Sequence, residues 1–256
     1  LDEIYRSSIV ILIGKFYNSS LLGYYNVGRQ IPGFISSTIN ATAASAFFPV
    51  FSKLQKDLIR GKVMLRKSIR TLNVLIFPTV CLTLLLADEI VHILLTDKWL
   101  PSVIYLKLFS VILGLHHIYM TSSAYINSLG HSFVTLKYSI FNKSIAFVVL
   151  ALTLNDGIEA IIYGQLLVVI LLIIFNTIPN RKYIKYSFKE QASDIVPILA
   201  INIFLYFSFS AINFEMANKF FQIILVTSIF LLVYLLMVFT FRLQVISDWS
   251  KIFKSN

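Results

Sequence analysis

The sequence predicts an all-α protein, a polytopic bundle of about eight transmembrane helices. Of its 256 residues, 57% are hydrophobic and only 13% are charged, whereas soluble domains carry roughly 25% charged residues. Apolar runs of spanning length follow one another along the chain. Strands of a membrane barrel are about 10 residues long and alternate in hydrophobicity, so these longer, evenly apolar runs favour helices.

A spanning helix needs about 20 consecutive apolar residues. Eight runs meet or approach this length, the first being the shortest: Ile4–Tyr17, Tyr24–Phe51, Thr71–Ala87, Val103–Ile126, Phe133–Leu154, Ile158–Ile178, Ile195–Ile212 and Phe220–Phe241. Gly130, Gly157 and Pro179 mark the boundaries of three of them. Prolines inside the other runs are compatible with membrane helices, because neighbouring groups satisfy the carbonyls that proline leaves free.

The charges of the connections predict the orientation in the membrane. Segments 52–70 and 179–193 and the C-terminal tail are rich in Lys and Arg, while the connections between them are not. Cytoplasmic loops carry the excess of Lys and Arg, and the alternation is in phase with eight spans, so both ends of the chain are expected in the cytoplasm. Residues 55–70 are read either as an amphipathic helix at the membrane surface or simply as a signal for topology.

Several other classes of function lack support in the sequence. The net charge of +10 sits between apolar runs, which fits a membrane topology signal better than nucleic-acid binding. No phosphate-binding G-x-x-x-x-G-K-[ST] loop, zinc spacing or catalytic cluster occurs, so we expect no cofactor, no metal and no enzymatic activity. The single cysteine, Cys81, lies in an apolar run and is read as a small apolar residue.

A series of short motifs resembles a known family. In chain order they are IGK (13–15), LGYYN (22–26), FFPVFSKLQKD (47–57), a run containing Pro78, TDKW (96–99) and SLG (128–130). From about residue 13 to residue 160 the chain resembles the WzxC-type lipopolysaccharide and polysaccharide flippases of the multidrug/oligosaccharidyl-lipid/polysaccharide exporter superfamily. Beyond residue 160 only the hydropathy is similar.

The resemblance implies twelve to fourteen helices in two six-helix lobes, with the substrate path between them. Residues 1–178 would form the second lobe, and 179–256 two additional transmembrane helices and a cytoplasmic tail. The first residue is Leu, which agrees with a first lobe of the same protein preceding this chain. The implied location is the bacterial inner membrane, and the implied partners are membrane lipids and a lipid-linked (polyprenyl-pyrophosphate) oligosaccharide. Members often carry an acidic residue before IGK; here Ser7 and Ser8 stand nearby, so that acid's role is not transferred.

Cations inside apolar runs are the first candidates for a substrate site, because burying a charge in a bilayer is costly. Lys143 lies near the middle of the fifth run and is the strongest candidate for a cavity cation. Arg29 heads a helical stripe that includes Asn40 and suits either a cavity or close packing; Arg29 itself is alternatively an interface anchor. Lys15 ends the first run and is read as an interface anchor or as part of the motif.

A second stripe begins at Lys107 and includes His117, with Ser110, Gly114 and Thr121 between or beyond them. Its spacing of three and four residues predicts one shared, inward face. A packing role competes with a substrate role for His117. Cations in a cavity would suit a pyrophosphate, since Lys and Arg form charge-assisted hydrogen bonds to phosphate oxygens.

The function expected is therefore translocation of a lipid-linked oligosaccharide from the cytoplasmic to the periplasmic leaflet for surface polysaccharide or lipopolysaccharide synthesis. One alternative is a membrane-embedded glycosyltransferase or polymerase of the same pathway, which would need carboxylates or His in extended outer loops. The outer loops are short, and Asp88, Glu89 and Asp97 form their one acidic cluster. A second alternative is a small-solute exporter of the same superfamily.

Overall fold

The computed structural model describes residues 2–212, 214 and 218–241. Within these ranges the all-α prediction is confirmed, since every element is helical and no strand occurs. In chain order the elements are α1 (Asp2–Phe16), α2 (Ser19–Lys53), α3 (Leu58–Leu85), α4 (Ala87–Leu94), η1 (Asp97–Ser102), α5 (Val103–Ser128), α6 (Ser132–Thr153), α7 (Ile158–Pro179), η2 (Asn180–Ile184), α8 (Phe188–Ser210) and α9 (Lys219–Thr240). The charges predicted for the C-terminal tail lie outside the described residues.

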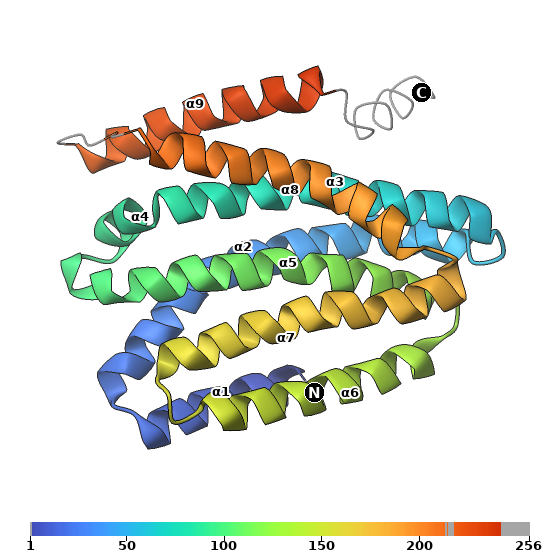
Figure 1. Ribbon diagram of the computed structural model, residues 1–256, viewed down its shortest axis with the longest axis horizontal. Coiled ribbons are helices and arrows are strands. Elements are labelled where there is room, and N and C mark those ends of the chain that lie inside the picture. Colours follow the sequence, from blue (N-terminus) through green and yellow to red (C-terminus); the bar gives the residue numbers. More distant parts are fainter. Residues whose placement is uncertain (1, 213, 215–217, 242–256) are drawn as a thin grey trace.

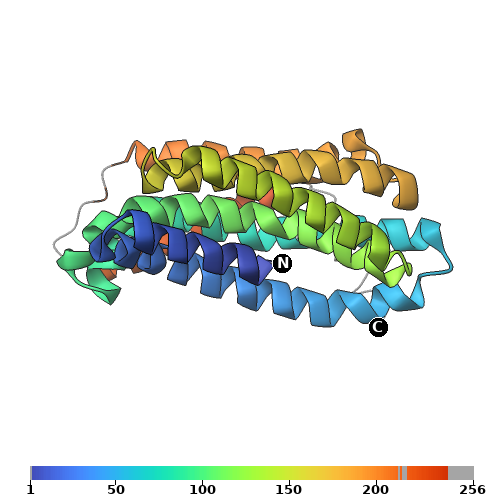
Figure 2. The same cartoon turned by 90° about the horizontal axis from the view of Figure 1, so that it is seen from below.

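The long helices run lengthwise in one elongated bundle. Seven of them among the described residues are long and apolar enough to cross a membrane, and the chain is a multi-pass membrane protein. The first of the eight predicted spans, Ile4–Tyr17, forms the helix α1, which has only 15 residues and falls short of the usual spanning length. Figure 2 shows the helices still running lengthwise after a quarter turn of the bundle.

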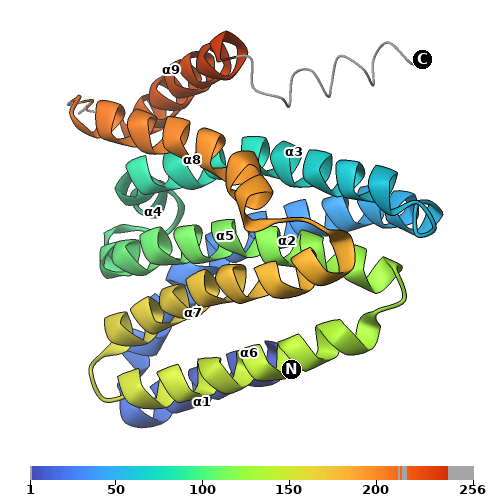
Figure 3. The same cartoon turned by 45° about the vertical axis from the view of Figure 1, so that its right-hand side comes forward.

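Helix α5 lies at the centre of the packing. It contacts α2, α3 and α7, while α8 packs on α3 and α6 packs on α7. Figures 1 and 3 show the resulting order from one edge to the other, α9, α8, α3, α5, α7 and α6. Helices α8 and α9 therefore lie on one side of α5, and α1, α6 and α7 lie on the other.

The connections divide between the two ends of the bundle as the chain crosses back and forth. Residues 54–57, 129–131 and 185–187 lie at one end, on the right of Figure 1. We call this the basic end, because segments 52–70 and 179–193 supply its Lys and Arg residues. Residues 17–18, 86–102 and 154–157 lie at the opposite end.

Polar residues in the connections start the next helices. The side chains of Asn18 and Asp57 accept hydrogen bonds from the backbone N–H groups of Leu21 (2.8 Å) and Arg60 (3.0 Å), and such caps satisfy N–H groups that have no partner within the helix. Gly157 takes a φ of +102° in the turn before α7, a conformation that glycine adopts without strain.

The prediction of a separate surface helix over residues 55–70 is wrong. Residues 58–70 are the first turns of α3, which continues without a break to Leu85. Helix α2 has 35 residues and is about 50 Å long, whereas the hydrocarbon core is about 30 Å thick. The hydropathy pattern marks the apolar part of each run, and the helices themselves continue beyond it.

The polar ends of α3 and α8 are held together by ion pairs at the basic end. Asp194 on α8 is 1% exposed and accepts hydrogen bonds from Arg66 Nε (2.7 Å) and Arg70 Nε (2.9 Å). The hydroxyl of Tyr186 donates to the same carboxylate (2.9 Å), and burial raises the pKa of Tyr186 above its usual range. Glu190 pairs with Lys62 Nζ (2.7 Å). Charges that looked like a loop in the sequence thus stabilise the contact between two helices.

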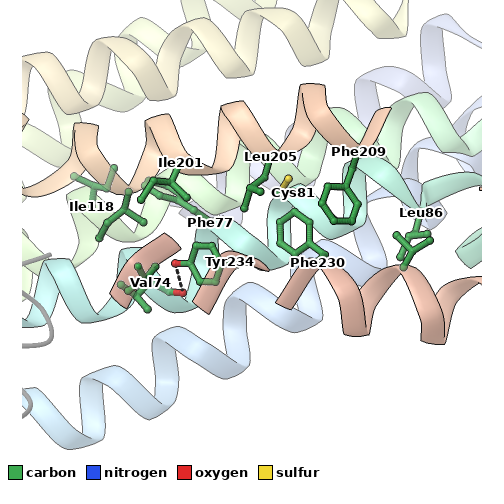
Figure 4. Packing of buried hydrophobic residues seen from close by; sticks show 13 residues of the cluster. Val74, Phe77, Cys81, Leu86, Ile118, Ile201, Leu205, Phe209, Phe230 and Tyr234 are labelled. Atoms are coloured by element: carbon green, nitrogen blue, oxygen red, sulfur yellow. Dashed lines mark hydrogen bonds between the residues drawn. The ribbon is translucent and has the colours of Figure 1, made fainter. Parts of the chain in front are cut away.

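Between α3, α8 and α9 the core is apolar and includes one buried hydroxyl (Figure 4). Tyr234 on α9 donates its hydroxyl hydrogen bond to the backbone carbonyl of Val74 (3.0 Å). In a regular helix this carbonyl would accept the N–H of residue 78, but residue 78 is Pro and has no N–H. Tyr234 therefore replaces the missing donor and ties α9 to α3 at the proline.

Candidate functional site

A polar cavity of about 180 Å³ lies between α1, α2, α5, α6 and α7. Aliphatic side chains form the remainder of its wall. Its polar, charged and tyrosine side chains are Asp2, Glu3, Tyr5, Arg6, Arg29, His116, Asn142, Lys143 and Gln165. Five helices thus place charged and amide groups around one space that opens at the surface of the bundle beside the exposed side chains of Asp2, Glu3 and Arg6.

Close contacts between helices bring these groups together. Gly28 lies so near α5 that a Cβ there would stand 2.6 Å from Tyr105 Cβ and 2.9 Å from the backbone N of Leu106. The neighbouring Arg29 is thereby held beside α5. Across the cavity, the ring of Tyr5 meets Phe147 edge to face, 5.2 Å between centroids, and this contact holds α1 against α6.

The cations of the cavity differ in their partners. Lys143 Nζ lies 2.5 Å from an Asp2 carboxylate oxygen and 5.0 Å from the centre of the Tyr5 ring. Arg6 pairs with Glu3 in the same helix. The guanidinium of Arg29 lies 5.8 Å from the Phe109 ring and forms no ion pair with any carboxylate that the structure describes. Arg29 is therefore the cation most available to an anion from outside the chain.

Neutral polar groups complete the lining. Asn142 is 4% exposed, and its Oδ1 has no hydrogen-bond partner within the described protein. A buried carbonyl oxygen without a partner costs about 1–3 kcal/mol, which a hydroxyl group entering the cavity would offset. Gln165 donates from Nε2 to the hydroxyl of Tyr25 (3.4 Å).

Two of the six residues predicted for the site, Arg29 and Lys143, share this cavity. Two other predicted cations lie outside this cavity. Lys107 pairs with Asp88 Oδ2 (2.9 Å) on the α4 side, away from the cavity. Lys15 is exposed and lies 6.0 Å from the Phe16 ring, a position that fits the anchor interpretation.

The remaining two predicted residues make contacts within the helix packing. Asn40 donates to the carbonyl of Ser36 (2.8 Å), one turn earlier on α2. His117 is fully buried; its Nε2 lies 2.7 Å from Asn73 Oδ1 and its Nδ1 lies 2.5 Å from the carbonyl of Gly114. The predicted inward face of the α5 stripe is correct for His117, and its contacts are those of a packing residue.

Seven cavity residues were missed as site candidates in the sequence: Asp2, Glu3, Tyr5, Arg6, His116, Asn142 and Gln165. A signal existed for Gln165, which is one of two amide residues in the strongly apolar run of α7. His116 precedes His117 on α5, and because adjacent helical residues point about 100° apart, His116 lines the cavity while His117 does not. Asp2 and Arg6 lie at the start of the first run, where charges usually mark the membrane interface.

The N-terminal part of the chain is similar to a known family. Residues 1–104 match the family described as polysaccharide biosynthesis protein. The match covers α1 to the first residues of α5 and includes Arg29, and it ends before Lys143. No curated protein and no solved structure matches the chain. The chain is thus a multi-pass membrane protein whose N-terminal part is similar to a polysaccharide biosynthesis family.

Proposed function

We propose that this chain is the second lobe, with two additional helices, of a flippase in the bacterial inner membrane. The flippase would move a lipid-linked oligosaccharide from the cytoplasmic to the periplasmic leaflet for the synthesis of surface polysaccharide or lipopolysaccharide. The observation that carries the proposal is the cavity in which Arg29 and Lys143 meet, in a chain whose first 104 residues match a polysaccharide biosynthesis family.

The chemistry of the substrate explains why such a cavity is useful. A pyrophosphate cannot cross hydrocarbon unpaired, because an unpaired charge at the bilayer centre is costly. Arg29 offers a planar set of donors without a carboxylate partner, which is the geometry that binds phosphate oxygens well. An entering phosphate would also compete with Asp2 for the ammonium group of Lys143. The free Oδ1 of Asn142 would accept a hydrogen bond from a sugar hydroxyl.

Transport then needs only binding and a change of access, with no covalent step. A first lobe of the same protein would close the other side of the path, and the two lobes would rock around the bound headgroup. The two cations would hold the pyrophosphate while the polar glycan passes, and the polyprenyl tail would stay in the lipid.

The contacts of the acidic cluster at the outer loops favour transport over glycosyl transfer. Asp88 is paired with Lys107, Glu89 accepts a hydrogen bond from Gln222 (2.8 Å), and Asp97 contacts His92. Each carboxylate thus has a structural partner, whereas a transferase or polymerase would need one poised to activate an acceptor. A small-solute exporter remains the second candidate, and the size of the substrate separates it from a flippase.

The test is complementation of a strain that lacks the whole protein. Arg29→Gln and Lys143→Gln should each lower surface polysaccharide about tenfold or more, because a hydrogen bond to a charged group contributes about 1.5–3 kcal/mol. Lys137→Gln is the matched control: it removes an exposed cation from the same helix as Lys143. If Arg29→Gln and Lys143→Gln gave as much surface polysaccharide as the control Lys137→Gln, at equal amounts of protein in the membrane, the proposed role of the cavity would be excluded.

A further inference from the structure

A second hollow lies at the basic end, where η2 connects α7 to α8. It has a volume of about 790 Å³ and shares no lining residue with the cavity around Arg29. Its lining residues are Thr177, Ile178, Arg181, Lys182, Ser187, Phe188 and Lys189. Three of these seven are cations and none is acidic.

The acidic groups near this hollow are already engaged by other cations. Glu190 is paired with Lys62 of α3, and Asp194 with Arg66 and Arg70. Within the part of the chain that the structure describes, Arg181, Lys182 and Lys189 therefore have no carboxylate partner. All three are exposed. The hollow has an uncompensated positive charge.

The same hollow has an apolar side. Ile178 is 56% exposed and Phe188 is 65% exposed. Helix α7 is mostly apolar and has no cation up to Pro179, and the first cation follows at Arg181. The hollow thus joins the end of an apolar helix to a cluster of cations, which is the pattern expected where acyl chains give way to headgroups. A water-soluble anion would use only the cations, whereas a lipid would also cover the two exposed apolar side chains.

We propose that this hollow binds one anionic glycerophospholipid. Its phosphate would lie against Arg181, Lys182 and Lys189, and an acyl chain would cover Ile178 and Phe188. Clusters of Lys and Arg between membrane helices at the headgroup level are the physical requirement for such binding. The lipid would bridge the end of α7 and the start of α8, and so stabilise the junction between the first six long helices and the last two.

Native mass spectrometry of the purified protein, titrated with phosphatidylglycerol or phosphatidylcholine, tests this site. We expect the wild type to bind phosphatidylglycerol at least tenfold more tightly than phosphatidylcholine. Each cation near the surface contributes about 1 kcal/mol, or about fivefold, so Lys189→Gln alone should weaken phosphatidylglycerol binding about fivefold. The triple variant R181Q/K182Q/K189Q should abolish the preference.

The matched control neutralises three exposed cations at the same end, Lys53, Lys56 and Arg60, and should keep the preference. An unchanged preference in R181Q/K182Q/K189Q would overturn the proposal, and so would an equal loss in K53Q/K56Q/R60Q. Displacement of phosphatidylglycerol by millimolar inorganic phosphate would also overturn it, since the site would then bind the phosphate group without any contribution from the acyl chain. Phe188→Ser keeps every charge and should weaken lipid binding severalfold, which separates the apolar contact from the net charge.

Discussion

The hydrogen bond from Tyr234 to the Val74 carbonyl allows a sharp prediction about stability. Tyr234→Phe removes one hydroxyl and leaves the ring in its stack with Phe230, 6.3 Å between centroids. Because Pro78 cannot supply an N–H, the Val74 carbonyl is then left without a partner in an apolar core. The loss should be about 1–3 kcal/mol in the free energy of unfolding.

The proline makes the reasoning testable by a double-mutant cycle. In a Pro78→Ala background, the alanine N–H becomes available to the Val74 carbonyl, so Tyr234→Phe should cost less there by about 1–2 kcal/mol. Unfolding is followed by far-UV circular dichroism as SDS is titrated into dodecyl maltoside micelles. Tyr163→Phe, which alters an exposed tyrosine, should stay within about 0.5 kcal/mol of the wild type. If Tyr234→Phe lowered the free energy of unfolding equally in both backgrounds, the claim that the Tyr234 hydroxyl replaces the N–H missing at Pro78 would be refuted.

Three further predictions use the same unfolding assay. Asp194→Asn should lower the free energy of unfolding by about 3 kcal/mol, because it leaves two arginines beside an uncharged group. Glu190→Gln removes a more exposed pair and should lower it by about 1 kcal/mol or less. Gly28→Ala should lose about 1–3 kcal/mol by overpacking against α5; Gly33→Ala, with no atom within 4 Å of the added Cβ, should be neutral or stabilising by up to about 1 kcal/mol. His117→Ala should lose about 2–4 kcal/mol yet leave polysaccharide export per folded molecule unchanged, and a selective loss of export would assign His117 to the site. Equal losses for Asp194→Asn and Glu190→Gln, or equal effects of Gly28→Ala and Gly33→Ala, would contradict the packing described.

The number and order of the long helices could be predicted from hydropathy, because a bilayer requires long apolar runs. Helix ends could not. The charges of residues 58–70 resemble a loop, yet α3 begins at Leu58, since its cations Lys62 and Arg66 pair with Glu190 and Asp194, which lie 128 residues later in the chain. A pairing over that distance leaves no local pattern in the sequence.

The candidate site was predictable in part for the same reason. Arg29 and Lys143 stood out because cations are rare inside apolar runs. Their meeting in one cavity depends on how α2 and α6 pack around α5, and Asn40 and Lys107 had equally good local patterns but point elsewhere. The partner of His117, Asn73, lies on another helix, so spacing alone predicted burial and could not separate packing from binding.

The most direct test of the central claim measures which leaflet holds the lipid-linked oligosaccharide. In membrane vesicles that contain the whole protein, the fraction of lipid-linked repeat units accessible to an impermeant glycan-binding reagent at the periplasmic face is followed over time. The double variant Arg29→Gln, Lys143→Gln should slow the appearance of these units at least tenfold, and Lys137→Gln should not. Equal rates for the double variant and the wild type, with equal amounts of protein in the membrane, would contradict the claim that this cavity carries the pyrophosphate.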